Sequence, residues 1–85
     1  MMDWHLQVYR TGQPHGRSLT FSSAESAIEA GNTALLSAEA DEIVVCHRLY
    51  SNQACLKLSI AVPNDELQSK ASHLERQAQR ASRDG

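Results

Sequence analysis

The stretch EIVVCHRLYSNQACLKLSIAV, residues 42–62, decides how this chain folds. Apolar and polar residues alternate on both sides of Asn52 and Gln53, which is the period-2 pattern of two half-buried strands joined by a turn. With this turn, one face of the pair is almost wholly aliphatic and has Leu58 and Ile60 at its centre. The stretch therefore predicts an antiparallel β-hairpin.

The turn also fixes which residues face each other. The expected inward-facing pairs are Leu49 with Leu56, His47 with Leu58, Val45 with Ile60, and Ile43 with Val62. A register shift of two residues keeps the same faces, whereas a shift of one would bury Lys57 and is excluded. The opposite, outward face then carries Val44, Cys46, Arg48 and Tyr50 beside Cys55 and Lys57.

In this register the cysteines and the neighbouring histidine do not form a site. Cys46 and His47 are adjacent in a strand and point to opposite faces. Cys46 and Cys55 share a face but lie two cross-strand pairs apart, about 11–13 Å, too far for a shared metal or a disulfide. We therefore expect no metal, no cofactor and no intramolecular disulfide. The cysteines are expected to be structural or incidental, with a reactive surface thiol as the alternative.

His47 is the odd residue on the aliphatic face. A histidine there could serve as a general base or a pH-sensitive element. The stronger interpretation is a core histidine that is hydrogen-bonded to backbone or to a helix side chain. The sequence fixes no Ser, Asp or Glu near it, so no catalytic set can be assembled and we expect no enzymatic activity.

The chain before residue 42 contains a second strand pair and a helix. Residues 4–21 alternate in polarity around Gln13 and Pro14, which we take as the centre of a turn. This pairing sets apolar residues opposite each other, Val8 with Leu19 and Leu6 with Phe21. Ser22 and Glu25 have the spacing of a capping box and predict a helix over residues 23–38. Gly31 within it indicates close approach to the sheet.

From Pro63 onward the pattern is helical again. Small and apolar residues follow a 4-3-4-3 spacing at Leu67, Ala71, Leu74, Ala78 and Ala81. This spacing predicts a C-terminal helix over residues 64–82. The whole chain, 1–85, then forms a single α+β domain of order ββαββα. It has an antiparallel sheet of about four strands with both helices on one face.

Composition limits what so small a domain can do. The 85 residues are 41% hydrophobic and carry a net charge of −2. That charge gives no general attraction to nucleic acid or to an anionic membrane. Between Arg17 and Arg48 there is no Lys or Arg, whereas this segment holds the carboxylates Glu25, Glu29, Glu39, Asp41 and Glu42. We expect a cytoplasmic protein with one acidic side and no membrane segment.

The open face of the sheet is the expected binding surface. Its outward residues, with one addition from the first strand, are Tyr9, Val44, Cys46, Arg48, Tyr50, Cys55 and Lys57. A semi-apolar face of this kind is typical of a protein interface. The acidic helix, with Glu25 and Glu29, favours a basic or nucleic-acid-associated protein partner, and a second copy of the chain is a further candidate.

A nucleic-acid-binding module is the alternative for the same face. Open sheets that display aromatic and cationic side chains bind single-stranded nucleic acids in several modules. Arg48 and Lys57 would then contact phosphates, and Tyr9 and Tyr50 would lie under bases. The net negative charge and the absence of a basic run oppose this alternative.

The order of elements resembles that of a group of known proteins. A short hairpin ending in SLTFSSAESAIEAG, residues 18–31, followed by a second hairpin and a terminal helix, is similar to small α/β proteins of phages and other mobile elements. These include several anti-CRISPR proteins, which typically act without catalysis by occupying a surface of a host complex. The resemblance implies an inhibitor or accessory binding protein, and it assigns no functional residue.

Overall fold

The computed structural model describes residues 2–84, so positions 1 and 85 of the expected domain lie outside the described residues. Its elements follow the order β1 (Trp4–Arg10), β2 (Gln13–Pro14), β3 (Leu19–Phe21), α1 (Ala24–Leu36), β4 (Glu42–His47), β5 (Cys55–Leu58) and α2 (Asn64–Asp84). The strands form one antiparallel sheet of order β2-β1-β4-β5, and β3 also pairs with β1. The predicted α+β class is confirmed.

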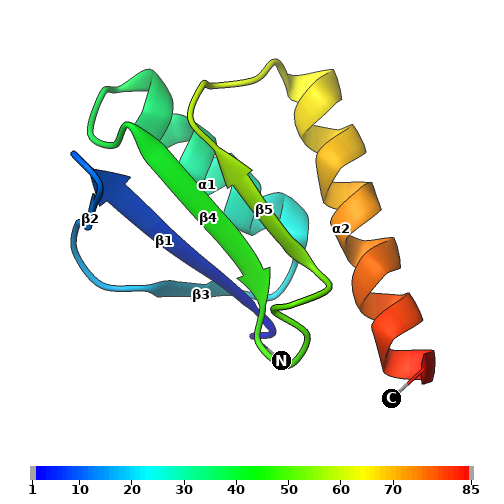
Figure 1. The fold of residues 1–85 in the computed structure, drawn as a ribbon. Coiled ribbons are helices and arrows are strands. Elements are labelled where there is room, and N and C mark those ends of the chain that lie inside the picture. The colour runs from blue at the N-terminus through cyan, green and yellow to red at the C-terminus, as the bar shows by residue number, and fades with distance from the viewer. Residues whose placement is uncertain (1, 85) are drawn as a thin grey trace.

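The helices leave one side of the sheet uncovered. Figure 1 shows α1 behind the sheet, where it packs against β1 and β4, and α2 alongside β5. The core between α1 and the sheet is aliphatic and centres on Leu6, Ile28, Ile43 and Val45. The two helices pack together through the predicted small-residue seam of α2, in which Leu67, Ala71, Leu74 and Ala78 are buried.

The first hairpin turns two residues earlier than expected. Thr11 and Gly12 both have positive φ, 51° and 79°, which a two-residue hairpin turn of the primed kind requires. Arg10 therefore pairs with Gln13. The exposed segment between β2 and β3 then shifts the register, so that Leu6 faces Leu19 rather than Phe21, and Phe21 faces Trp4. The predicted strand is thus divided in two, which gives five strands rather than four.

Helix α1 begins one residue later than predicted, and a different residue caps it. Ser23, not Ser22, is the N-cap, and its hydroxyl accepts a hydrogen bond from the Ser26 amide at 3.1 Å. The expected partner in a capping box is Glu25, but the acid that binds the first turn is Glu75 of α2, which accepts from the Ala24 amide at 2.9 Å. The start of α1 is therefore tied to α2.

Gly31 marks the point where α1 lies closest to the sheet, as predicted. A Cβ at this position would collide with the δ1 methyl of Ile43 and lie 3.0 Å from Cδ1 of Leu6. Both neighbours are at most 2% exposed, so they have little room to move. At the next position, the buried Asn32 side chain donates to the Val62 carbonyl (2.9 Å) and accepts from the Val62 amide (2.8 Å).

The second hairpin differs most from the prediction. Ile43 faces Leu58 and Val45 faces Leu56, a shift of four residues from the expected register. The even shift keeps Leu58 inside, but it ends β5 there and leaves Ile60 76% exposed. Leu49, expected inside, lies in the connection between the strands and is 61% exposed.

This register makes a prediction for two neighbouring aliphatic residues. Leu58→Ala should lower the free energy of unfolding by about 2–5 kcal/mol because it opens a cavity in the core. Ile60→Ala should change it by no more than about 0.5 kcal/mol because that side chain lies in solvent. Urea unfolding followed by circular dichroism measures both. Comparable losses at the two positions would contradict the register.

Gly31→Ala should also destabilise the fold. Helix propensity favours Ala by up to about 1 kcal/mol, but crowding in a packed core costs about 1–3 kcal/mol. Ile43→Val removes the δ1 methyl that the new Cβ would meet, so the double variant should lose less than the sum of the single variants. Additive losses in this double-mutant cycle would show that the two side chains do not compete for space.

Candidate functional site

The side of the sheet that faces away from both helices is named here the outer face. Cross-strand pairs define it: His5 with Cys46, Gln7 with Val44, Tyr9 with Glu42, Val44 with Lys57, and Cys46 with Cys55. The central residues are only half-buried, and Cys55 and Lys57 at the β5 edge are exposed. The outer face is therefore a shallow, open surface on the three longest strands.

Five of the nine predicted binding residues meet on the outer face. They are Tyr9, Val44, Cys46, Cys55 and Lys57. The prediction left out Gln7 and Glu42, which complete the centre and one end of the face. The alternation within β1 and β4 contained this information, because residues two apart in a strand point the same way.

Tyr50 does not lie on the outer face, contrary to the prediction. It belongs to the connection between β4 and β5, where its ring stacks on that of His47 at 5.0 Å. His47 in turn contacts the edge of Trp4, 4.9 Å away. The predicted strand ended too late, and the tyrosine therefore covers the end of the core.

A carboxylate lies close to each of the two cations predicted on the outer face. Arg48 lies just past β4, where its amide donates to the Asp3 carbonyl at 2.7 Å and its guanidinium forms an ion pair with the Asp3 carboxylate at 3.3 Å. Lys57 lies 3.6 Å from the Glu42 carboxylate. The local positive potential of this surface is correspondingly small.

The acidic residues of the first helix lie on the other side of the molecule. Glu25 and Glu29 are exposed on α1, which covers the inner face of the sheet. The sheet therefore separates them from the outer face. One flat partner surface cannot contact both regions.

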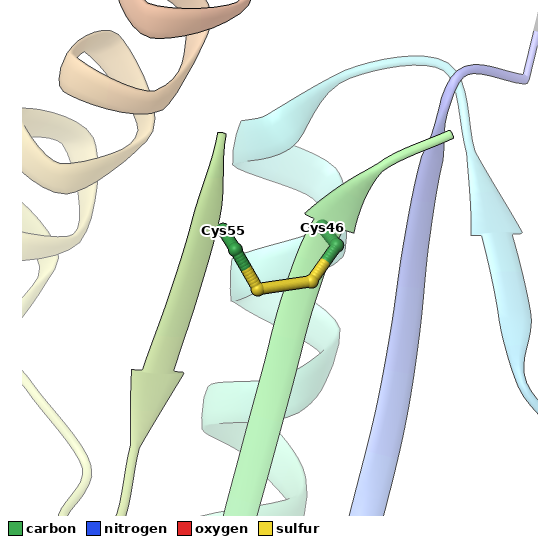
Figure 2. Close-up of a disulfide and its surroundings, with 2 residues drawn as sticks. All are labelled: Cys46 and Cys55. Carbon is green, nitrogen blue, oxygen red and sulfur yellow. A yellow bond between two sulfur atoms is a disulfide. The ribbon is translucent and has the colours of Figure 1, made fainter. Parts of the chain in front are cut away.

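Cys46 and Cys55 form a disulfide, which overturns the expectation that they lie too far apart. Figure 2 shows the bond bridging β4 and β5 on the outer face. The two residues are direct cross-strand partners, with Cα atoms 4.2 Å apart. His47 donates its amide to Ala54, so the cysteines occupy the neighbouring non-hydrogen-bonded pair, where Cα atoms come closest.

The buried His47 side chain forms hydrogen bonds with the backbone that follows it. His47 Nδ1 accepts from the amides of Leu49 (3.1 Å) and Tyr50 (3.3 Å). This arrangement matches the interpretation of His47 as a core histidine bonded to backbone. Within residues 2–84, no three His, Cys, Asp or Glu side chains are grouped so that they could hold a metal ion.

No family model, curated protein or solved structure matches the chain. None of the helices within the described part is long and apolar enough to cross a membrane. Disulfides persist mainly in oxidising compartments, so the bond does not favour the expected cytoplasmic location, which stays a prediction.

The disulfide makes a direct chemical prediction. In denaturant without reductant the chain should expose no free thiol, and after reduction it should expose both. Closing a loop with a separation of nine residues stabilises a fold by about 2–3 kcal/mol through the entropy of the unfolded chain. Reductant should therefore lower the urea midpoint of the native protein.

The control for this experiment is the variant Cys46→Ser with Cys55→Ser. Its free energy of unfolding should match that of the reduced protein within about 1 kcal/mol, and reductant should not change its urea midpoint. Two free thiols in the unreduced monomer would show that the cysteines are not paired.

Proposed function

We propose that this protein is a non-catalytic binding module that engages a partner protein through the outer face of its sheet. The observation that carries the proposal is that both helices lie on the other side, which leaves the three longest strands uncovered among the described residues. Sheets with one uncovered face usually place polar residues along it. This one has Val44 and the disulfide at its centre instead.

The arrangement of the outer face suits a protein interface. Val44 and the disulfide supply the apolar groups near the centre, Tyr9 lies at the end beside Glu42, and the Glu42–Lys57 ion pair lies at the border. Protein interfaces combine an apolar centre, often with tyrosine, and a polar rim. His5 and Gln7 add hydrogen-bonding groups that remain half-exposed.

The same geometry favours protein over nucleic acid. Binding of a single strand without sequence preference relies on stacked aromatics and on cations that neutralise phosphates. Of the described Phe, Trp and Tyr residues, Tyr9 alone lies on the outer face, because Tyr50 stacks on His47. Lys57 is paired with Glu42, and Arg48 with Asp3.

We extend the proposal to an inhibitor of a host complex that handles nucleic acid. Its supports are the resemblance in element order to small mobile-element proteins and the segment between Arg17 and Arg48, which contains no Lys or Arg. Complementary charge would steer such a protein toward a basic partner and make the association rate depend on salt. Because Glu25 and Glu29 lie on the far side from the outer face, they would contribute to steering rather than to contact.

Site-specific photo-cross-linking in a lysate of the native cells tests this proposal. A photoreactive amino acid in place of Val44 reports on the outer face, and the same amino acid in place of Glu29 is the matched control on α1. We expect a discrete cross-linked protein from position 44, unchanged by nuclease, and none from position 29.

Other results would identify other functions. A product that disappears after nuclease treatment would replace the proposal with the nucleic-acid-binding alternative. Cross-linking from position 29 alone would make α1 the interface. A product of twice the mass of the chain would identify a homodimer.

A further inference from the structure

A groove runs between the free edge of β5 and helix α2, apart from the outer face. We propose that it binds an extended acidic peptide of a partner protein, which adds to the sheet as a strand beside β5. This mode of recognition combines backbone hydrogen bonds along an exposed edge with side-chain pockets that alternate along the peptide. The proposal adds a second site and does not depend on the function of the outer face.

The backbone of β5 offers the hydrogen-bonding groups for such a strand. Within residues 2–84, β5 pairs with β4 alone and forms one edge of the sheet. The hydrogen bond from His47 to Ala54 fixes which residues bond to β4, and alternation then turns the amides and carbonyls of Cys55 and Lys57 away from it. An added strand would find two donors and two acceptors there.

Helix α2 forms the other wall of the groove. Figure 1 shows α2 running alongside β5 over the length of the strand. The groove has a volume of about 460 Å³, and its walls include Cys55, Leu56, Lys70, His73, Leu74 and Arg76. Leu56 is half-buried and Leu74 is buried, so the floor is apolar. An apolar side chain of the peptide would fit against these two leucines.

The charge of the groove selects the chemistry of the peptide. Lys70, His73 and Arg76 all line it, and a neighbouring hollow of about 300 Å³, which shares Gln77, adds Arg80. No carboxylate is among the described residues that line either cavity. The groove is therefore locally basic although the chain as a whole carries a net charge of −2.

A second copy of this chain fits the groove less well. Pairing of two β5 edges would bring the basic sides of both α2 helices close together, and like charges at such an interface oppose association. An acidic peptide instead brings charges that Lys70 and Arg76 complement. Carboxylates at alternate positions would face α2 on either side of an apolar residue.

Fluorescence anisotropy with a labelled peptide tests the proposal on the full chain. The probe is acetyl-TETVTET-amide, in which glutamate, valine and glutamate share one face of the strand. We expect saturable binding of this probe and at least about tenfold weaker binding of acetyl-TKTVTKT-amide, a difference of about 1.4 kcal/mol. Lys70→Glu with Arg76→Glu should weaken binding of the acidic probe by a similar factor.

The control for charge is Arg10→Glu with Arg17→Glu, which changes the net charge equally at exposed positions near the opposite edge of the sheet. This variant should bind the acidic probe within about twofold of the native protein. An equal loss in both double variants would show that net charge, rather than the groove, governs the interaction.

Lys57→Pro tests the backbone pairing itself. Proline removes the outward-facing amide and blocks the edge, yet it spares the hydrogen bonds to β4. It should weaken probe binding at least about tenfold, whereas Lys57→Thr, which also lacks the ion pair with Glu42, should bind as the native protein does. Thermal unfolding checks that both variants fold.

Amide hydrogen exchange of the native protein provides a readout that needs no variant. Probe binding should slow exchange at Cys55 and Lys57. Absence of probe binding, unchanged exchange at these two amides, or undiminished binding by a folded Lys57→Pro variant would overturn the proposal. Tighter binding of labelled oligothymidine than of the acidic probe would also overturn it and assign the groove to nucleic acid.

Discussion

The side chain of His47 sets the path of the chain between β4 and β5. Its Nδ1 atom accepts the amides of Leu49 and Tyr50, so the chain turns away from the sheet directly after the histidine. The Tyr50 carbonyl then accepts from the amides of Gln53 and Ala54, which returns the chain with Ala54 opposite His47. Everything in β5 follows from this closure, because the connection fixes the register of a hairpin.

The consequences of that register extend across the domain. It places the two cysteines opposite each other, turns Leu56 and Leu58 toward the core, and ends the strand before Ile60. It also determines which amides of β5 face the free edge. A polar group in the core thus organises an otherwise aliphatic sheet, and Trp4 and Tyr50 shield it on two sides.

The sequence was sufficient to predict the faces of the strands but not their partners. Alternation in residues 42–62 places Cys46 outward and His47 inward in any register with an even shift, and the structure agrees with both. The burial of Lys57 excludes a register shift of one residue but leaves every even shift possible. A compact turn at Asn52 and Gln53 is only one of the connections that these even shifts allow. The actual connection, residues 48–54, depends on a side-chain hydrogen bond that polarity patterns do not encode.

Helix boundaries show the same limit. The small-residue seam of α2 was visible because its spacing is periodic, and Gly31 because glycine inside a helix needs a reason. The capping of α1 could not be predicted from the sequence, because Glu75 reaches the Ala24 amide from 51 residues away in sequence. Those residues of the candidate site that lie within strands could be predicted, because strand alternation alone determines which face they occupy. Tyr50 was misplaced because β4 ends at His47, and the β5–α2 groove was missed because it depends on how α2 packs beside β5.

The paired hydrogen bonds between Asn32 and Val62 have a mechanical consequence. The amide group of Asn32 satisfies both polar atoms of the Val62 backbone, as a neighbouring strand would. It anchors the linker between β5 and α2 to α1, while Glu75 anchors α2 further along. With its two walls held by separate attachments to the same helix, the space between β5 and α2 is pre-organised. A ligand entering it would sacrifice its own conformational freedom but little of the protein's, which favours recognition of a short segment.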